Sequence, residues 1–464
     1  MRLLQRSFKS PFEVLSPEQS IERGGTFGGN VGNLVFTEAA QKILGTPDTT
    51  VDLDRLRLRK GISAWINSEY DALVIPLANA FRPSFQRSLQ DLTRIIRRLD
   101  VPVVVLGVGA QAGVDGDVTA MAAVEDDVRA FVAAVLDHGP TIGVRGEFTA
   151  EYLQGLGFAD VEVIGCPSMF RYGPELPPTR TAPVTDDTRI AVNGAHALFA
   201  EQGFGRFVER LVDRFPETTF FGQNALEGLQ LRWRDVSSDF GGLTDVPTHP
   251  EHPLYRAGRA RLHVDPTTWI AALREVDYSV GGRIHGNIAA VLAGTPALVL
   301  TGDARTLELS RYFEIPHRLL RSLPEEVDPA RLLEEADWAP MHAGHRARWE
   351  RFAGYLRRHG LGNAFDDGDG GRAFEERLAA LDFPPPITPS TLSDLEAARD
   401  QVAWLRAELA TSERERRRAE WRRVRAAGAT RADAPRTAAP RVEAPPRRTR
   451  GQGGLLRRMR RPRG

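Results

Sequence analysis

The residues with the clearest capacity for chemistry are Arg283, His285 and Gly286, in the segment GGRIHGN. They follow a short apolar run and two glycines, and a helical pattern of apolar residues begins directly after them. A guanidinium binds carboxylate or phosphate through its planar fork, an imidazole transfers protons near neutral pH, and a helix N-terminus attracts anions. The segment therefore predicts an anion-binding site in which His285 transfers protons. The alternative is that Arg283 covers a sheet edge and His285 is an ordinary hydrogen-bonded loop histidine.

A second arginine, Arg145, has a similar setting, because it lies between a predicted strand, residues 141–144, and a predicted helix, residues 148–156. Asn30 and Asn33 belong to a glycine-rich loop that leads into a helix, and such loops let backbone amides approach a ligand closely. A tight surface turn is the alternative for this loop. Two guanidiniums and a histidine suit a small substrate that carries two anionic groups.

Two successive blocks of the chain contain the elements that must position these residues. In each block, continuous runs of Val, Ile and Leu alternate with helical patterns, which predicts a parallel sheet covered on both faces. The blocks span residues 1–173 and 188–326, and a proline-rich polar linker, residues 174–187, joins them. Residues 327–383 are predicted to be helical and to pack on this body. Ligands of parallel sheets bind beyond the carboxyl ends of the strands, so we expect the site in a cleft between two domains.

Metal and thiol chemistry have little support in the sequence. Residues 224–264 show no clear period and are predicted to line or cover the cleft, but His249, His252 and His263 lack the close spacing of metal ligands. The single cysteine, Cys166, excludes an internal disulfide and a thiolate cluster, and we expect it to be a small buried residue. We predict no metal and no cofactor.

Length and composition define the class of protein. The 464 residues suffice for two domains and an extension. No run approaches the roughly 18 apolar residues of a membrane span, and the first residues lack the apolar core of a signal peptide. We therefore expect a cytoplasmic protein. From Ile387 onward the chain has 20 Arg against 9 Asp and Glu, although the net charge of the whole is zero, so a mildly acidic body carries a basic tail.

Residues 384–464 are predicted to form a short helix and a disordered basic tail. Leu395, Val402 and Leu409 recur every seven residues, as in a helix that pairs, and a single solvated helix is the alternative. Beyond Ala426 the chain consists mainly of Arg, Ala, Pro and Gly. Such tails bind anionic membranes, nucleic acids or acidic partners. No recognition motif supports sequence-specific nucleic-acid binding, and an anionic membrane surface would place the protein at the inner face of the membrane.

Three segments resemble the polysaccharide pyruvyl transferase family: GVRGEFTAEYLQGLG around Arg145, GGRIHGNIAAVLAGTPALVL around Arg283 and His285, and GGNVGN around Asn30. The resemblance extends over residues 24–315. It implies two Rossmann-like domains facing a cleft, similar to the GT-B arrangement of glycosyltransferases. It also implies an enzyme of polysaccharide biosynthesis that transfers the pyruvyl group of phosphoenolpyruvate to two hydroxyls of a saccharide, giving a pyruvate ketal and phosphate.

By the family pattern, Arg145 and Arg283 bind the carboxylate and phosphate of the donor, and His285 handles protons or the departing phosphate. The acceptor is implied to be a saccharide, either free or linked to a lipid.

One departure from the family leaves the base on the acceptor hydroxyl open. Many members carry an acidic residue where this chain has Asn33. Glu38, Glu147 and His285 are the candidates for that base.

Two other functions are compatible with the same residues. A glycosyltransferase would use the helix N-terminus at Gly286 to bind the diphosphate of a nucleotide sugar. A non-catalytic assembly protein would instead be recruited through its basic tail, and changing His285 would then have no effect.

Overall fold

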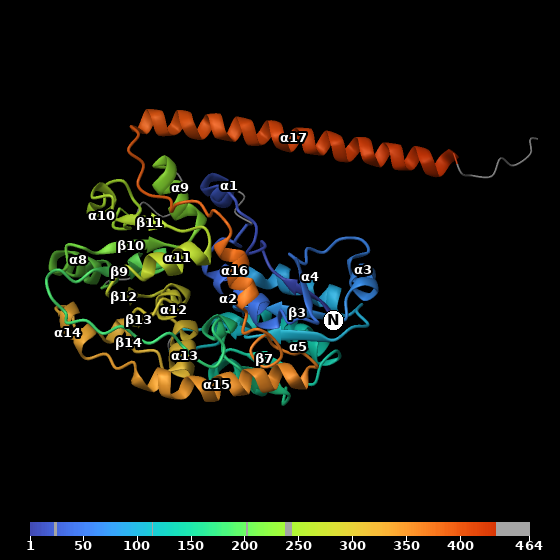
Figure 1. Ribbon diagram of the computed structural model, residues 1–464, viewed down its shortest axis with the longest axis horizontal. Coiled ribbons are helices and arrows are strands. Elements are labelled where there is room, and N and C mark those ends of the chain that lie inside the picture. Colours follow the sequence, from blue (N-terminus) through green and yellow to red (C-terminus); the bar gives the residue numbers. More distant parts are fainter. Residues whose placement is uncertain (23–25, 114, 201–202, 237–243, 433–464) are drawn as a thin grey trace, which may run out of the picture. The chain divides into compact units, whose positions relative to one another are not determined.

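The computed structural model describes residues 1–22, 26–113, 115–200, 203–236 and 244–432. The chain divides into two compact units, Met1–Gln401 and Val402–Gly464. The first unit contains two parallel sheets with helices around them (Figure 1), so the predicted α/β fold class is confirmed.

The N-terminal sheet is parallel, with strand order β2-β1-β3-β5. The amides of Gly107 and Val108 donate to the carbonyl of Gly143, which places β7 beside β5, and β8 pairs with β7. The strands are β1 (Arg2–Arg6), β2 (Thr50–Asp54), β3 (Ala72–Pro76), β5 (Val103–Leu106), β7 (Ile142–Val144) and β8 (Val161–Val163), with the short pair β4 (Asn79–Phe81) and β6 (Gly109–Ala110) beyond β3 and β5.

Strand β1 was not predicted from the sequence. Its sequence RLLQR has only two apolar residues and so lacks the continuous apolar run of a buried strand. Gln5 is nevertheless buried, because its side-chain amide donates to the carbonyl of Thr37 at 2.8 Å. The Nε2 group of Gln5 is thereby satisfied, whereas its buried Oε1 has no hydrogen-bond partner among the described residues.

Helices with one apolar face cover the N-terminal sheet. Helix α4 has Leu89, Leu92, Ile95 and Ile96 buried, at the spacing of one helix face. Helix α2 packs against β3 and also against α11 and α12 of the second domain, so it joins the two halves (Figure 1). The helices are α1 (Pro17–Glu22), α2 (Gly32–Leu44), α3 (Ile62–Glu69), α4 (Gln86–Ile96), α5 (Glu125–Leu136) and α6 (Glu147–Gly155).

The C-terminal sheet has six parallel strands in the order β11-β10-β9-β12-β13-β14, the order of a dinucleotide-binding Rossmann sheet. Its strands are β9 (Ile190–Asn193), β10 (Thr219–Gly222), β11 (Ala260–Leu262), β12 (Tyr278–Gly281), β13 (Ala297–Thr301) and β14 (His317–Leu319). Its helices are α7 (His196–Ala200), α8 (Phe204–Arg214), α9 (Ala225–Trp233), α10 (Pro253–Arg256), α11 (Pro266–Leu273), α12 (Ile284–Leu292) and α13 (Ala304–Phe313).

In each sheet the strand order reverses at one point, so that strands before and after this point are added on opposite sides of it. This point lies between β1 and β3 in the first sheet and between β9 and β12 in the second. In open parallel sheets such a point leaves a crevice at the carboxyl ends of the strands, where ligands bind. The topology thus indicates where a site can form before any side chain is considered.

The stretch of residues 224–264 is more regular than its sequence suggested. It contains α9, α10 and β11. The side chains of Asn224 and Glu227 each accept from the other's backbone amide, which forms a capping box at the start of α9. This Asn-x-x-Glu spacing was the available signal for the helix.

The predicted linker is tied to the C-terminal domain. The guanidinium of Arg180 donates to the carbonyls of Arg274 at 2.5 Å, Val276 at 3.1 Å and Gly294 at 3.3 Å. These bonds fix the linker on the end of the second domain.

Of the helices that follow the second sheet, the first packs against α8 and the next two return to the first sheet and its helices. They are α14 (Pro329–Glu334), α15 (Ala339–Arg358) and α16 (Arg372–Ala379). The buried hydroxyl of Tyr355 on α15 accepts from the amide of Gly143 and donates to the carbonyl of Val105, which links α15 to β5 and β7. Because α15 also packs against α13, it spans both domains (Figure 1).

The chain beyond residue 383 differs from the predicted short helix and tail. Ile387 is buried and pairs with Leu262 of β11, so this segment belongs to the body. Helix α17 (Asp394–Ala432) has 39 residues and is longer than predicted. Along it, Leu395, Val402 and Leu409 are exposed. The predicted disordered tail from residue 433 lies outside the described residues. None of the described helices has the length and apolar character that a membrane crossing requires.

Candidate functional site

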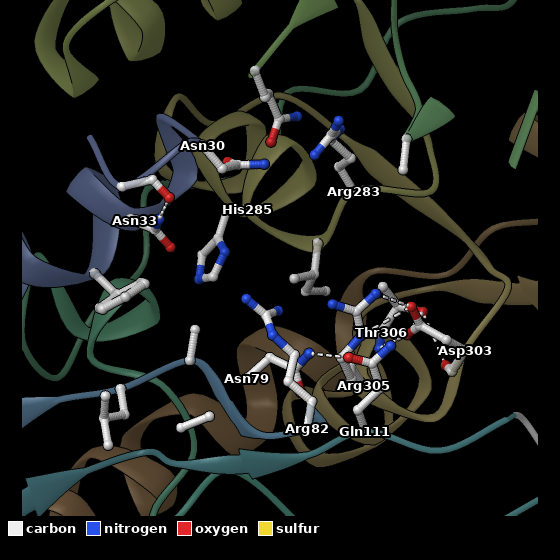
Figure 2. Close-up of a pocket in the computed structure, with 18 of the residues that line it drawn as sticks. Asn30, Asn33, Asn79, Arg82, Gln111, Arg283, His285, Asp303, Arg305 and Thr306 are labelled. Carbon is white, nitrogen blue, oxygen red and sulfur yellow. Dashed lines mark hydrogen bonds and ion pairs between the residues drawn. The ribbon is translucent and has the colours of Figure 1, made fainter. Parts of the chain in front are cut away.

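A cavity of about 440 Å³ lies where the carboxyl ends of the two sheets face each other. Its lining follows strands of both sheets, as the topology indicates. In Figure 2, His285 and the side chains of Arg82, Arg283 and Arg305 surround one open space. Its polar and charged lining residues are Arg6, Asn30, Asn33, Asn79, Arg82, Gln111, Arg145, Gln223, Arg283, His285, Asp303, Arg305 and Thr306.

The loop between β12 and α12 presents Arg283. A Cβ at Gly281 would collide with the carbonyl oxygen of Asn193 on the neighbouring β9, so the strand must end in glycine there. The side-chain oxygen of Asn193 accepts from the Arg283 amide at 2.9 Å, and the Gly194 carbonyl accepts from its Nε at 3.0 Å. The loop conformation and the direction of the guanidinium are therefore both fixed.

Glu227, which the sequence analysis did not select, also holds Arg283. Its Oε1 lies 3.2 Å from Nη2 of Arg283. Its Oε2 accepts from the amides of Gln223 at 2.5 Å and Asn224 at 3.1 Å, and the carboxylate is fully buried. The capping box of α9 thus supplies the counter-charge of Arg283. That capping pattern is visible in the sequence, but its connection to Arg283 depends on tertiary structure.

The ring of His285 is partly buried against Phe36, with ring centroids 5.4 Å apart. Burial, together with the nearby charge of Arg145, lowers the pKa of His285 to about 3. A neutral imidazole at neutral pH can accept a proton or donate its N–H. His285 is therefore neutral while the cavity contains no anion.

Cys166 lies unexpectedly close to His285. Its Sγ is 3.6 Å from the Nε2 of His285 and accepts from the Ser168 hydroxyl at 3.0 Å. No base is near this cysteine in sequence, so only the fold could reveal the pair. Cys166 is fully buried, and burial raises the pKa of its thiol. The thiol is thus suited to orienting the imidazole and unsuited to nucleophilic attack.

Arg145 lies just beyond β7 and is only 2% exposed. In the part of the chain that the structure describes, its Nε and one terminal nitrogen, Nη2, have no hydrogen-bond partner. A Cβ at Gly109 would overlap the Arg145 side chain, so glycine there makes room for it. A buried guanidinium with unused donors at a cavity wall is prepared to bind an oxyanion.

The glycine-rich loop brings Asn30 and Asn33 to the cavity. The side-chain oxygen of Asn30 accepts from the Gly32 amide at 2.7 Å, and Asn33 donates to the carbonyl of Phe27 at 3.0 Å. Both carboxamides therefore shape the loop and also line the cavity. A Cβ at Gly32 would lie 2.9 Å from the Cβ of His285, so the loop approaches the histidine closely.

Gly286 was predicted to bind substrate but does not line the cavity. Its amide donates to the Arg283 carbonyl at 3.1 Å, within the first turn of α12. Its α-carbon faces Asn193 and Gln223, where a Cβ would not fit. In this structure Gly286 lets the helix start pack closely and makes no contact with the cavity.

Four further charged residues line the cavity: Arg6, Arg82, Asp303 and Arg305. Asp303 caps α13 by accepting from the Thr306 amide and pairs with Arg305. Although burial alone would raise the pKa of Asp303, Arg305 and these hydrogen bonds hold it below its usual value. All four were missed. Arg6 ends a strand that was not predicted, and Arg82, Asp303 and Arg305 lie just after strands, in a chain whose many arginines carry little signal.

The structure narrows the candidates for the acceptor base. Glu38 is buried in an ion pair with Arg171 at 2.6 Å, and Glu147 is exposed and lines a different cavity. Among the described residues, His285 is the remaining predicted candidate on the wall of the arginine-rich cavity, and Asp303 is the carboxylate present there.

The three histidines expected near the cleft lie away from it. His249, His252 and His263 are not part of the cavity wall. His263 stacks on Phe221 with ring centroids 6.0 Å apart, and burial lowers its pKa to about 3. The described residues contain no group of three or more His, Cys, Asp or Glu side chains arranged to hold a metal ion.

These features define an α/β protein with a cationic cleft between two parallel sheets. Residues 30–303, more than half of the chain, match the family described as polysaccharide pyruvyl transferase. The chain therefore belongs to the polysaccharide pyruvyl transferase family, as its sequence motifs predicted.

Several solved structures share similarity with this chain at low identity. An uncharacterized protein from Klebsiella pneumoniae is 12% identical, with a TM-score of 0.36 over 67% of this chain and 87% of that one. A putative UDP-N-acetylglucosamine 2-epimerase from Listeria monocytogenes is 13% identical, with a TM-score of 0.39 over 83% and 98%. The UDP-GlcNAc 2-epimerase of Methanocaldococcus jannaschii is 10% identical, with a TM-score of 0.37 over 82% and 99%. No curated protein matches the sequence.

Proposed function

We propose that this cavity transfers the pyruvyl group of phosphoenolpyruvate to two hydroxyls of one saccharide, forming a pyruvate ketal and releasing phosphate. The observation that carries the proposal is the unpartnered, buried guanidinium of Arg145 beside His285 in a cavity with five arginines. Family membership favours this reaction over the alternatives of nucleotide-sugar transfer and non-catalytic assembly.

The donor suits the charges of the cavity. Phosphoenolpyruvate carries about three negative charges at neutral pH, one on its carboxylate and two on its phosphate. Arg145 and Arg283 hold these two groups in the proposal. Arg283 uses Nε and Nη2 to bond Gly194 and Glu227, which leaves Nη1 for a ligand. Arg82 adds a cation to the same wall.

His285 acquires its proton because the donor binds. An opposite charge nearby favours the charged form of an imidazole, so the bound trianion raises the low pKa of His285. The resulting imidazolium donates a proton to the methylene carbon of the donor. The neutral imidazole that remains can then accept the proton of an acceptor hydroxyl, so one residue serves as acid and then as base.

The atoms balance over two additions. Protonation of the methylene carbon makes it a methyl group and leaves the central carbon electrophilic. The first sugar hydroxyl adds there and loses its proton, the bond to the phosphate oxygen then breaks, and the second hydroxyl adds and loses its proton. The two hydroxyls together release two protons. One of these replaces the proton that His285 gave to the carbon, and the other leaves with the phosphate. Fixed guanidiniums stabilise the charge that moves to the phosphate, and holding both substrates makes each addition effectively unimolecular.

A panel of saccharide acceptors tests the proposal. Phosphate release should depend on both phosphoenolpyruvate and one class of saccharide, and a UDP-sugar should not replace the donor. Transfer from a UDP-sugar with no response to phosphoenolpyruvate would overturn the proposal in favour of glycosyl transfer. The panel should include lipid-linked saccharides, because the acceptor class is part of the proposal.

A further inference from the structure

The cavity contains more cationic groups than the donor requires. Two of its five arginines already face carboxylates, since Arg283 pairs with Glu227 and Arg305 pairs with Asp303. Arg82, Arg145 and a protonated His285 provide about three positive charges, which equals the charge of the donor. One arginine of the wall, Arg6, remains without an assigned anion.

Arg6 is a buried cation without a paired anion, which is unusual in a folded protein. It is 8% exposed, and in the described part of the chain no carboxylate or carbonyl accepts from its guanidinium. Its guanidinium carbon lies 5.1 Å from the centre of the Phe8 ring and 5.8 Å from that of Phe85. Burial lowers the pKa of Arg6 to about 10, so the side chain is still charged at neutral pH. Burying an unpaired charge is costly, and such groups are retained where a ligand completes them.

The position of Arg6 separates it from the donor end of the cavity. Arg6 is the last residue of β1, and Arg145 follows β7, which is three strands further along the sheet order β1-β3-β5-β7. At about 4.8 Å between neighbouring strands, their backbones start roughly 14 Å apart. Burial is the main cause that lowers the pKa values of His285, Arg82 and Arg6, and the charge of Arg145 adds to the lowering at His285 and Arg82 but not at Arg6. The cavity therefore has a donor end at Arg145 and His285 and a second end at Arg6. Arg82 lies between the two ends, because its guanidinium carbon is 5.9 Å from the centre of the Phe85 ring that Arg6 also faces.

Aromatic rings give the second end the character of a sugar site. Phe8 and Phe85 line the cavity beside Arg6, and Asn33 and Gly28 line it as well. Flat apolar rings pack against the C–H face of a sugar, and carboxamides bond its hydroxyls. A guanidinium between such rings is suited to an acid group carried by the sugar.

We propose that the acceptor is an acidic saccharide and that Arg6 binds its acid group, a singly charged oxyanion such as a uronate carboxylate or a phosphodiester. This inference rests on the proposed function, because it divides the same cavity between donor and acceptor. Arg6 is then the residue that selects the acceptor, and it has no part in the chemical steps at His285.

Calorimetric binding of matched sugars tests the proposal without requiring turnover. Methyl glucuronide and a methyl phosphodiester of glucose should bind the full-length protein at least about tenfold more tightly than methyl glucoside. Arg6→Met should remove that preference and leave phosphoenolpyruvate binding within about twofold. Comparison of the carboxylate with the phosphodiester identifies which acid the site prefers. Arg87→Met, on the exposed face of α4, is the matched control and should change neither.

Three results would overturn the proposal. They are equal binding of acidic and neutral sugars by the wild type, an unchanged preference in Arg6→Met, and a loss of phosphoenolpyruvate binding in Arg6→Met. The third would make Arg6 a donor residue. Thermal unfolding checks the variant itself, because removing an unpaired buried charge should leave it at least as stable as the wild type. Phosphate release with neutral acceptors in the same preparations reports on pyruvyl transfer separately, so failure of one proposal is distinguishable from failure of the other.

Discussion

At the residue scale, the proposed mechanism couples donor binding to the protonation of His285. Because burial and Arg145 lower its pKa to about 3, His285 is neutral in the empty cavity, and a bound trianion raises that pKa. At pH 7.5 we therefore expect phosphoenolpyruvate binding to take up more protons in the wild type than in His285→Ala. Calorimetry in two buffers of different ionisation enthalpy measures the difference. Equal uptake in both proteins would show that another group receives the proton.

The two predicted donor arginines differ in how they are held. Arg145 is buried with unused donors, whereas Arg283 is already bonded to Gly194 and Glu227. Lysine keeps the charge but loses the planar fork. We expect Arg145→Lys to weaken phosphoenolpyruvate binding by at least about tenfold, or about 1.4 kcal/mol, and Arg283→Lys to weaken it less. A titration of both variants checks this, and unchanged affinity in both would place the donor elsewhere.

At the element scale, the cap of α9 orients the loop that carries Arg283. Glu227 accepts from the amides of Gln223 and Asn224 and pairs with Arg283, so it joins the start of α9 to the end of β12. Glu227→Gln keeps the shape and removes the charge. We expect it to lower the free energy of unfolding by about 1–3 kcal/mol and to raise the KM for phosphoenolpyruvate. The exposed Glu209 on α8 supplies the control, since Glu209→Gln should change neither value. Wild-type stability and kinetics in Glu227→Gln would show that Glu227 does not orient the loop.

The sequence predicts elements best where one physical signal dominates. Continuous apolar runs predicted the parallel sheets, and the change from a strand pattern to a helical pattern located Arg145, Arg283 and His285 just after strands. Strand β1 was not predicted because it contains the polar Gln5, whose Nε2 finds its hydrogen-bond partner 32 residues away. The sequence also did not predict that the site includes Glu227, Cys166 and Arg6. Their places in the site depend on which strands are neighbours in the sheets.

At the scale of the whole molecule, we predict that the basic tail binds the protein to an anionic membrane surface. Residues 447–463 hold eight arginines with Leu455, Leu456 and Met459 among them, and each basic residue near an anionic membrane contributes roughly 1 kcal/mol of attraction. Because Ile387 pairs with β11, a truncation should follow Ala432 and spare the body. The full chain should sediment with anionic but not neutral vesicles at low salt, and the truncated chain should not. Equal sedimentation of both would exclude the tail as the anchor, and turnover on a free saccharide should be the same for both.

The central claim is that the cavity adds a pyruvyl ketal to a saccharide with a proton delivered by His285. Mass spectrometry of the acceptor after reaction in D₂O tests it most directly, because protonation of the methylene carbon leaves a permanent isotopic record. The account predicts a phosphoenolpyruvate-dependent ketal whose methyl group carries one solvent deuterium, formed by the wild type and lost in His285→Ala. A product formed without phosphoenolpyruvate, a ketal without solvent deuterium, or ketal formation by His285→Ala within about tenfold of the wild-type rate would contradict it.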